Sequence, residues 1–280
     1  MGSKEGFDEY ILDSFRYIGG RRFHNVFDAK YFFPNDIGEV DRLQTEHYLY
    51  QHIWKGNFSS PVQQTLKKPG ATVLDVGCGP GSWVIDMART FPSAIFVGLD
   101  ISPIFPSEKQ KPPNASFLQL NLLDGLPSLS TALEESQWKD VILELIRITK
   151  PGVHKFLAKF NINLDVCPII ENGLRNNKQL KNVEHKRCSV LVGPWGGRLG
   201  EMMTANIMNI NLAVKPALSQ FMEITHEEFD KMLQLCRSEI DSNKHCLKIS
   251  RKEGVQGVGV VGEIREIVGE IREVVVEERS

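Results

Sequence analysis

The feature that most constrains the fold is a glycine-rich turn between a strand and a helix. Residues 71–76 form an apolar run with the length of a buried strand, and residues 82–90 place apolar side chains at helical spacing. The connecting sequence is Asp75-Val-Gly77-Cys-Gly79-Pro-Gly81. Glycine lets the backbone turn sharply and approach a ligand closely, because no Cβ intervenes. This order predicts the first half of a β-α-β unit.

A second strand is predicted over residues 94–99, where an apolar run ends at Asp100, and a third over residues 115–120. Strands joined by a helix run parallel, with a right-handed crossover. In an open parallel sheet, a ligand binds beyond the carboxyl ends of the strands. Asp75, the glycines and Asp100 are therefore predicted to meet at one site. An acid at Asp100, 19 residues after Gly81, can accept hydrogen bonds from both hydroxyls of a ribose.

The spacing of the glycines distinguishes two classes of nucleoside-binding protein. A dinucleotide fingerprint is Gly-x-Gly-x-x-Gly, but Ser82 stands where its third glycine belongs. Residues 73–81 instead resemble the first motif of the class I S-adenosylmethionine-dependent methyltransferases. Further matches, to a fungal group of methyltransferase-domain proteins, are residues 97–102, 121–127, 145–152 and Gly56-Asn-Phe-Ser59. The resemblance covers roughly residues 36–245 and is strongest over 71–127.

The resemblance implies a fold and a cofactor. The fold is α/β, a Rossmann-like three-layer sandwich with a mostly parallel sheet, which an antiparallel strand near residues 186–192 joins late in the chain. The cofactor is S-adenosyl-L-methionine. Asp75 and the backbone of residues 77–81 are implied to hold its methionine end, and Asp100 its ribose. Asn121 is implied to bond the adenine amino group, and Leu122 to pack on the ring.

The residues that the resemblance assigns to cofactor binding are Asp75, Gly77, Cys78, Gly79, Gly81, Asp100, Ile101, Asn121 and Leu122. A purely structural interpretation of the same pattern is also open. In that interpretation Asp75 caps the turn, and the glycines only permit tight packing.

No catalytic residue and no metal site are predicted. Methyl transfer from a sulfonium is an in-line displacement on an activated methyl group, so the protein mainly aligns the reactants and excludes water. A general base helps only when the acceptor must lose a proton. His47 and His52, with Tyr48, lie on a helix predicted over residues 36–54 and are candidates for that base. A histidine on a half-buried helix is more often structural.

The second half of the chain is less regular. Residues 188–192 are a strand candidate, and a helix is predicted over residues 199–212. The glycine-rich residues 193–200, which include Trp195 and Arg198, form either an anion site at a helix N-terminus or a surface turn. A later helix is predicted to begin with a capping box made by Thr225 and Glu228.

One part of the family pattern is missing. Only residues 128–136 separate Pro127 from a helix predicted over residues 137–149. The family places a strand there, of the form Phe-Asp-x-Val, beside the first strand in the middle of the sheet. Without it, the neighbouring strand keeps an unpaired edge unless another segment moves in. Residues 153–164, which alternate apolar and polar side chains, are the candidate.

Three functions remain open at this point. The first is methyl transfer from S-adenosylmethionine to a small molecule, and the cofactor motifs favour it. The second is binding of S-adenosylmethionine without catalysis, because the acceptor side of the pattern is incomplete. The third is a nicotinamide-dependent oxidoreductase, which the glycine spacing disfavours.

The chain divides into three predicted parts. Residues 1–35 form an aromatic-rich N-terminal extension, residues 36–252 the methyltransferase-like domain, and residues 253–280 a low-complexity tail. In the tail, the sequence Val-Gly-Glu-Ile-Arg-Glu of residues 261–266 recurs at residues 268–273. Two repeats with glycines are too few for a coiled coil, so the tail is predicted to have no defined role.

Composition and charge bear on partners and location. The net charge of the 280 residues is −2, so the chain lacks the bulk basic charge of a nucleic-acid-binding protein, which favours a small molecule as the acceptor. No apolar stretch is long enough to cross a membrane. The five cysteines form no Cys-x-x-Cys pair and are predicted to be reduced thiols. We therefore expect a soluble cytoplasmic protein with no nucleic-acid or membrane partner.

Overall fold

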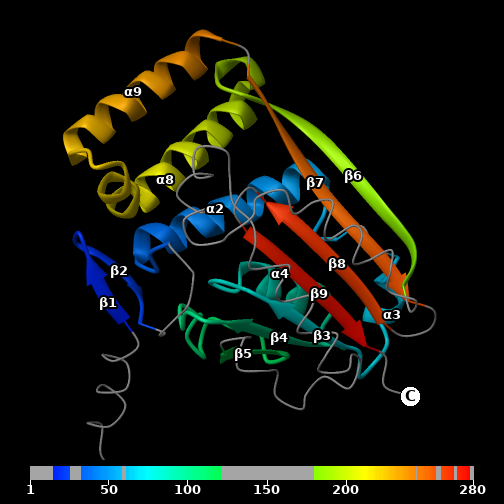
Figure 1. The fold of residues 1–280 in the computed structure, drawn as a ribbon. Coiled ribbons are helices and arrows are strands. Elements are labelled where there is room, and N and C mark those ends of the chain that lie inside the picture. Colours follow the sequence, from blue (N-terminus) through cyan, green and yellow to red (C-terminus); the bar gives the residue numbers. More distant parts are fainter. Residues whose placement is uncertain are drawn as a thin grey trace, which may run out of the picture. The chain divides into compact units, whose positions relative to one another are not determined.

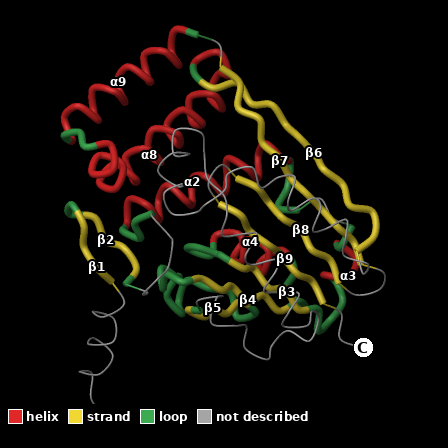
Figure 2. The backbone as a smooth tube through the Cα atoms, viewed as in Figure 1, coloured by secondary structure: helices red, strands yellow, loops and turns green. Residues whose placement is uncertain are grey.

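The structure, a computed structural model, describes residues 15–25, 33–58, 61–120, 180–243, 245–256, 260–267 and 270–277 (Figures 1 and 2). The chain forms two compact units that alternate along the sequence. The first unit draws on Met1–Leu49, Ile101–Ile104 and Val190–Leu247, and the second on Tyr50–Asp100, Phe105–Ser189 and Lys248–Ser280. The helix predicted over residues 137–149 and the strand predicted over residues 153–164 lie outside the described residues.

A seven-stranded sheet has the strand order β5-β4-β3-β9-β8-β7-β6. The strands are β3 (Thr72–Val76), β4 (Ile95–Asp100), β5 (Ala115–Gln119), β6 (Leu180–Val192), β7 (His245–Gln256), β8 (Val260–Ile267) and β9 (Glu270–Glu277). β3 pairs with β4 and β4 with β5 in parallel, which confirms the predicted α/β, Rossmann-like fold. β9 pairs antiparallel with β3 and with β8, and β8 pairs antiparallel with β7. The strand predicted near residues 186–192 belongs to β6, which joins the sheet.

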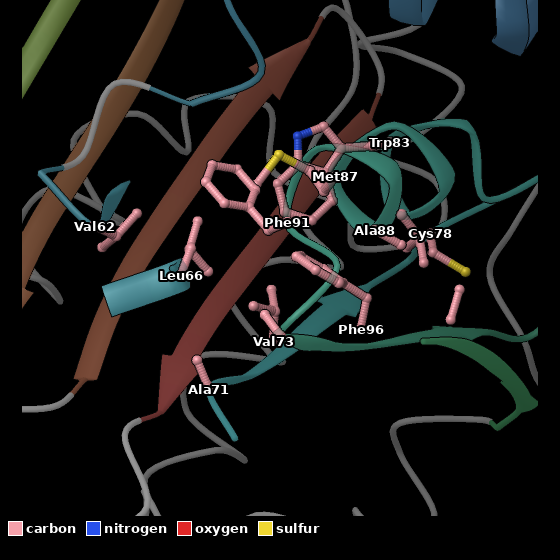
Figure 3. Packing of buried hydrophobic residues seen from close by; sticks show 13 residues of the cluster. Val62, Leu66, Ala71, Val73, Cys78, Trp83, Met87, Ala88, Phe91 and Phe96 are labelled. Carbon is pink, nitrogen blue, oxygen red and sulfur yellow. The ribbon is translucent and has the colours of Figure 1, made fainter. Parts of the chain in front are cut away.

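Apolar side chains hold the β3–α4–β4 unit together. The helix α4 (Ser82–Thr90) buries Trp83, Val84, Met87 and Ala88, which the sequence places on one side. Trp83 packs edge to face against Phe96 of β4, with ring centroids 6.4 Å apart (Figure 3). The short helix α3 (Gln63–Leu66) adds the fully buried Leu66 to this cluster. Burying a side chain of this size contributes about 1.5–3 kcal/mol.

The place beside β3 is taken by a strand from the C-terminal segment (Figure 1). In the antiparallel register of β9 with β3, Val275 lies opposite Leu74 and Val274 opposite Asp75. Residues 253–280 are predicted to be a tail with no defined role, yet they contribute β8 and β9. The three valines of residues 274–276 favour a strand, because β-branched side chains fit a pleated surface. The sheet therefore joins a parallel part, β3–β5, to an antiparallel part, β7–β9.

The first unit contains a hairpin and several helices. β1 (Phe15–Ile18) and β2 (Arg21–His24) pair antiparallel. The helix α2 (Ile37–Trp54) begins in this unit and ends in the second, and the short helix η2 (Pro194–Gly196) leads into α8 (Gly197–Met222). α8 continues past its predicted end at residue 212 and passes through Pro216. α9 (His226–Ser242) begins with the predicted capping box: Glu228 N–H donates to Thr225 Oγ1 at 3.2 Å, and Thr225 N–H to Glu228 Oε2 at 2.8 Å.

Close backbone packing explains two glycines of residues 193–200, Gly196 and Gly200. A Cβ on Gly196 would lie 2.4 Å from the carbonyl oxygen of Leu191, and a Cβ on Gly200 would lie 2.3 Å from that of Gly193. Thr204 Oγ1 accepts a hydrogen bond of 2.9 Å from the Gly193 N–H. These contacts favour the structural interpretation of the segment over an anion site.

Across the described ranges, no helix combines the length and the apolar character that crossing a bilayer requires.

Candidate cofactor-binding site

Adjacent parallel strands carry the two predicted acids. β3 and β4 pair with Asp75 opposite Gly98, and Asp100 is the last residue of β4. Because neighbouring parallel strands end at the same edge of a sheet, both acids lie at the carboxyl ends of their strands. Asp75 is buried, with 1% of its surface exposed, and Asp100 is half-buried.

The loop between β3 and α4 has a left-handed backbone at three positions. The φ angle is 74° at Gly77, 54° at Gly79 and 75° at Gly81. An L-residue with a Cβ would cost roughly 1–2 kcal/mol at such a position. The alternation of glycine with other residues in this loop is therefore required by the path of the backbone.

Backbone hydrogen bonds anchor the loop on the end of β4. The N–H groups of Gly77 and Cys78 donate to the carbonyl oxygen of Leu99 at 2.8 and 2.9 Å. The N–H of Gly79 donates to Oδ2 of Asp100 at 2.8 Å. A hydrogen bond to an ionised group contributes about 1.5–3 kcal/mol. The structure thus brings the glycine turn and the distant acid into direct contact, while their use in cofactor binding stays a prediction.

The helix α4 begins immediately after this loop. Its N-cap is Gly81, which has no side chain to bond the first N–H groups of the helix. Those groups lack partners within the helix and carry the positive end of its dipole. A carboxylate is favoured at such a helix start. The start of α4 therefore suits an anionic group.

An aromatic pair, which the sequence analysis does not single out, fills the space next to the loop. A Cβ on Gly81 would lie 2.3 Å from Cε1 of Phe117, and a Cβ on Gly98 would lie 2.8 Å from Cδ1 of the same ring. Phe105 stacks on Phe117 with centroids 5.3 Å apart. Gly81 thus has a packing role in addition to its backbone conformation. The sequence signal for this contact is Gly98 itself, since a glycine inside an apolar strand marks a close approach.

Polar contacts tie the end of α2 to α4. The indole N–H of Trp83 donates to the carbonyl oxygen of Asn57 at 2.9 Å. Gln51 Nε2 lies 3.0 Å from Asn57 Oδ1 and 3.3 Å from Asp86 Oδ2. These bonds give a structural role to Asn57, which belongs to the Gly56-Asn-Phe-Ser59 similarity. They fix the position of the helix whose start adjoins the glycine loop.

The other predicted binding residues are placed in part. Ile101 directly follows Asp100 and is half-buried. Asn121 and Leu122 lie outside the described residues. The residue before them, Leu120, donates its N–H to the carbonyl oxygen of Asp100 at 2.9 Å. The chain therefore leaves β5 at the same edge of the sheet as Asp100.

The candidate bases are not brought to one place. His47 is buried and packs edge to face on Tyr48, with centroids 4.9 Å apart, whereas His52 is exposed. His47 and Tyr48 belong to the first unit, and His52 to the second. The burial of His47 favours a structural role, and no catalytic residue is assigned.

These features fit a nucleoside that carries an amino acid. Asp100 offers carboxylate oxygens for a ribose, and the start of α4 offers backbone donors for a carboxylate. The sequence agrees: the chain belongs to a family described as a methyltransferase domain, whose sequence model matches residues 67–235, more than half of the chain. It is thus a member of the class I S-adenosylmethionine-dependent methyltransferases.

Two of three curated relatives carry the word methyltransferase in their names. "Methyltransferase pytC" of Aspergillus terreus is 40% identical over 98 residues, which are 34% of this chain and 29% of that protein. "Secondary metabolism regulator laeA" of Aspergillus flavus is 36% identical over 92 residues, 33% of this chain and 24% of that protein. "Protein-methionine methyltransferase laeA" of Emericella nidulans is 32% identical over 99 residues, 35% of this chain and 26% of that protein. The chain thus matches less than a third of the length of each of these relatives.

Proposed function

We propose that the protein binds S-adenosyl-L-methionine at the glycine loop and transfers its methyl group to a small-molecule acceptor. The observation that carries this proposal is the 2.8 Å hydrogen bond from Gly79 N–H to Asp100 Oδ2. This bond holds Asp100, which is proposed to bind the ribose, against the glycine loop, which is proposed to hold the methionine end. Membership of the methyltransferase domain family supports the same cofactor.

Each described residue of the site has one task in this proposal. Asp75, at the end of β3, pairs with the ammonium group of the methionine part. The backbone of residues 77–81 lines the methionine part, and the start of α4 binds its carboxylate, because the first N–H groups of a helix carry partial positive charge. Asp100 accepts hydrogen bonds from the ribose hydroxyls. Asn121 and Leu122 are proposed to hold the adenine.

When bound, the cofactor supplies an activated methyl group on a sulfonium. The chain needs to hold the acceptor in line with that methyl group and to keep water out. Holding reactants in a productive geometry supplies much of the barrier reduction in such a reaction. The buried cluster around Trp83 and the aromatic pair Phe105–Phe117 give the loop a rigid support for this task.

The acceptor is proposed to be a small molecule, because the near-neutral chain has no bulk charge for nucleic acid. One relative is named for methylation of protein methionine, so a methionine-containing peptide is the acceptor to test against a small molecule. We propose a cytoplasmic location, because the five cysteines form no Cys-x-x-Cys pair and are expected to be reduced thiols.

A second candidate function is binding of the cofactor without transfer. The observation behind it is the antiparallel β9 at the place beside β3. The family has there a parallel strand that leads into a loop on the acceptor side. A chain that fills this place from its C-terminal segment keeps the cofactor contacts and changes the acceptor side.

A thermal melt with S-adenosylmethionine and with S-adenosylhomocysteine tests the binding step. A ligand at 100 times its Kd stabilises the native state by about 2.7 kcal/mol. For a domain of about 150–250 residues, each kcal/mol raises the Tm by roughly 2–4 °C. NAD at the same concentration is the control, and a shift with NAD alone would refute the proposed cofactor.

The transfer step needs its own measurement. Release of S-adenosylhomocysteine is followed with a pool of small hydroxyl, amine and thiol compounds, and separately with a methionine-containing peptide. Turnover with the small molecules supports the first candidate. A Tm shift without turnover on either pool supports the second.

A further inference from the structure

The C-terminal segment contains the same short sequence twice, and the structure places the two copies on adjacent strands. Residues 261–266 and residues 268–273 both read Val-Gly-Glu-Ile-Arg-Glu. The first copy lies in β8, and the second ends within β9. Of these two strands, β9 pairs with β3 and β8 does not. The repeat therefore raises the question of whether the first copy could take the place of the second.

The register of β9 against β3 can be compared with the register one repeat earlier. In the structure Glu277, Val275 and Glu273 lie opposite Thr72, Leu74 and Val76. A shift of seven residues would place Glu270, Val268 and Glu266 opposite the same three positions. The five residues that pair with β3 would change from Glu-Val-Val-Val-Glu, residues 273–277, to Glu-Ile-Val-Gly-Glu, residues 266–270. The two segments differ only by Ile267 for Val274 and Gly269 for Val276.

The repeat also carries its own connection between strands. β8 and β9 pair up to Ile267 opposite Glu270, with Val268-Gly269 between them in the sequence. One repeat earlier, Val261-Gly262 stands between Val260 and Glu263. A hairpin of residues 253–260 with residues 263–270 therefore has a connection of the same length and composition.

We propose that β3 accepts either repeat as its neighbour, so that the C-terminal segment has two registers seven residues apart. In the second register, residues 271–277 leave the sheet. This inference is independent of methyl transfer, because it rests on sequence identity and strand pairing alone. Register is weakly specified where glycine-rich strands offer similar pairings, which is the situation here.

The pairings explain why the observed register dominates. It includes six residue pairs between β7 and β8, from Ser250 opposite Glu266 to Val255 opposite Val261. The second register would break these pairs and use residues 253–260 in place of β8. That segment contains glycines at 254, 257 and 259, which weaken a strand. The second register is therefore a minor state in the unmodified chain.

Engineered disulfides in the full chain can report both registers. Opposite residues on antiparallel strands have Cα atoms about 4.5–5.5 Å apart, which suits a disulfide. The pair Leu74→Cys with Val275→Cys reports the observed register. The pair Leu74→Cys with Val268→Cys reports the second. After mild oxidation, mass spectrometry of protease digests identifies each link separately from the native cysteines.

A proline can shift the balance between the two registers. Proline cannot donate to a strand ladder, so Val275→Pro disfavours the observed register but lies outside the second one. We expect Val275→Pro to raise the yield of the link between residues 74 and 268 several-fold. Arg279→Pro, which lies beyond β9, is the matched control and leaves the yield unchanged.

Two outcomes would overturn the proposal. One is a folded Val275→Pro variant that forms no link between residues 74 and 268. The other is an unfolded variant, since the first repeat would then have failed to replace the second. Gly269→Val makes residues 266–270 more like residues 273–277 and is a second test, because it is expected to raise the same link without any proline. An unchanged yield in that variant also contradicts the proposal.

Discussion

The backbone N–H of Gly79 donates a hydrogen bond of 2.8 Å to Oδ2 of Asp100, which joins the glycine loop to the end of the neighbouring strand. Asp100 therefore has a structural partner before any ligand binds. A carboxylate offers about four acceptor sites on its two oxygens, so this contact is compatible with further bonds to a ribose. The same residue links the stability of the loop to the proposed binding of the cofactor.

Replacing Asp100 with alanine should weaken binding of S-adenosylmethionine. Loss of hydrogen bonds to a charged group costs about 1.5–3 kcal/mol, which corresponds to a roughly ten- to hundred-fold higher Kd. Isothermal titration calorimetry measures this change. Asp41→Ala, at an exposed position of α2, is the control and should keep the Kd of the unmodified chain. Equal affinities in the two variants would remove Asp100 from the site.

A ligand analogue separates loss of the ribose contact from loss of loop order. The unmodified chain should bind S-adenosylhomocysteine better than its 2′,3′-dideoxy analogue, because only the former has ribose hydroxyls. Asp100→Ala should bind the two equally. If Asp100→Ala still preferred the hydroxyls, the acid would act only by holding Gly79.

Replacing Gly81 with alanine should destabilise the fold strongly. The new Cβ would meet both a left-handed backbone, with φ at 75°, and the ring of Phe117 at 2.3 Å. Backbone strain of roughly 1–2 kcal/mol adds to overpacking of roughly 1–3 kcal/mol. Urea unfolding gives the difference in the free energy of unfolding.

A second glycine separates these two costs. Gly70 has a φ of 83°, but no atom lies within 4 Å of the position of its Cβ. Gly70→Ala should therefore lose only the roughly 1–2 kcal/mol of backbone strain. Adding Phe117→Leu to Gly81→Ala should recover part of the overpacking cost. Equal losses at the two glycines would show that Phe117 is not in the way.

The β3–α4–β4 unit was predictable because its signals are local. The apolar run before Asp75, the glycine spacing and the helical periodicity around Trp83 each specify structure within a few residues. The contact of Gly81 with Phe117 was not predicted, because it joins residues from elements far apart in the sequence. Only the lone Gly98 in an apolar strand indicated that something approached there.

The role of the C-terminal segment could not be derived from its composition. Glycine and alternating charge in the repeat are typical of low complexity. Its position beside β3 depends on pairing with Leu74 and Val76, some 200 residues earlier, and on which other segments compete for that edge. Strand pairing of this kind is decided by tertiary context, whereas the capping box of Thr225 and Glu228 is decided by four residues.

Stability should depend on pH through Glu39. Burial raises the pKa of this carboxyl above its ordinary value of 4.5, although hydrogen bonds from Arg42 act in the opposite direction. A group with a raised pKa in the folded state stabilises that state below its unfolded pKa and loses this contribution as pH rises. Glu39→Gln removes the titration but keeps an acceptor for Arg42. From pH 4.5 upward, the unmodified chain should lose stability relative to Glu39→Gln.

A carboxylate whose pKa is shifted in the opposite direction is the control for this experiment. Hydrogen bonds from Thr225 lower the pKa of the exposed Glu228 in the capping box. Its contribution is present above its unfolded pKa and is lost as pH falls, so the unmodified chain should lose stability relative to Glu228→Gln on acidification. Thermal melts from pH 3.5 to 7.5 measure both trends. If the stability difference from the unmodified chain changed with pH in the same direction for both variants, the raised pKa of Glu39 would be contradicted.

Arg42 should be among the most costly residues of the first unit to remove. Its buried guanidinium donates two hydrogen bonds to Glu39 Oε1, at 2.7 and 2.9 Å, and lies 3.1 Å from Glu46 Oε2. Asn206 accepts a hydrogen bond of 3.2 Å from Arg42 and donates one of 2.7 Å to Glu46. Arg42→Met leaves two buried carboxylates without their cation, which costs about 3–5 kcal/mol.

Arg237→Met is the matched control, since its pair with Asp241 at 2.8 Å is exposed on α9 and such a pair contributes about 0.3–0.5 kcal/mol. Urea unfolding at neutral pH should therefore separate the two variants by several kcal/mol. Adding Glu39→Gln and Glu46→Gln to Arg42→Met should restore most of the loss, because the cost comes from the uncompensated charges. If the triple variant were no more stable than Arg42→Met, the loss of stability would come from lost packing of the arginine stem between α2 and α8 and not from the uncompensated charges.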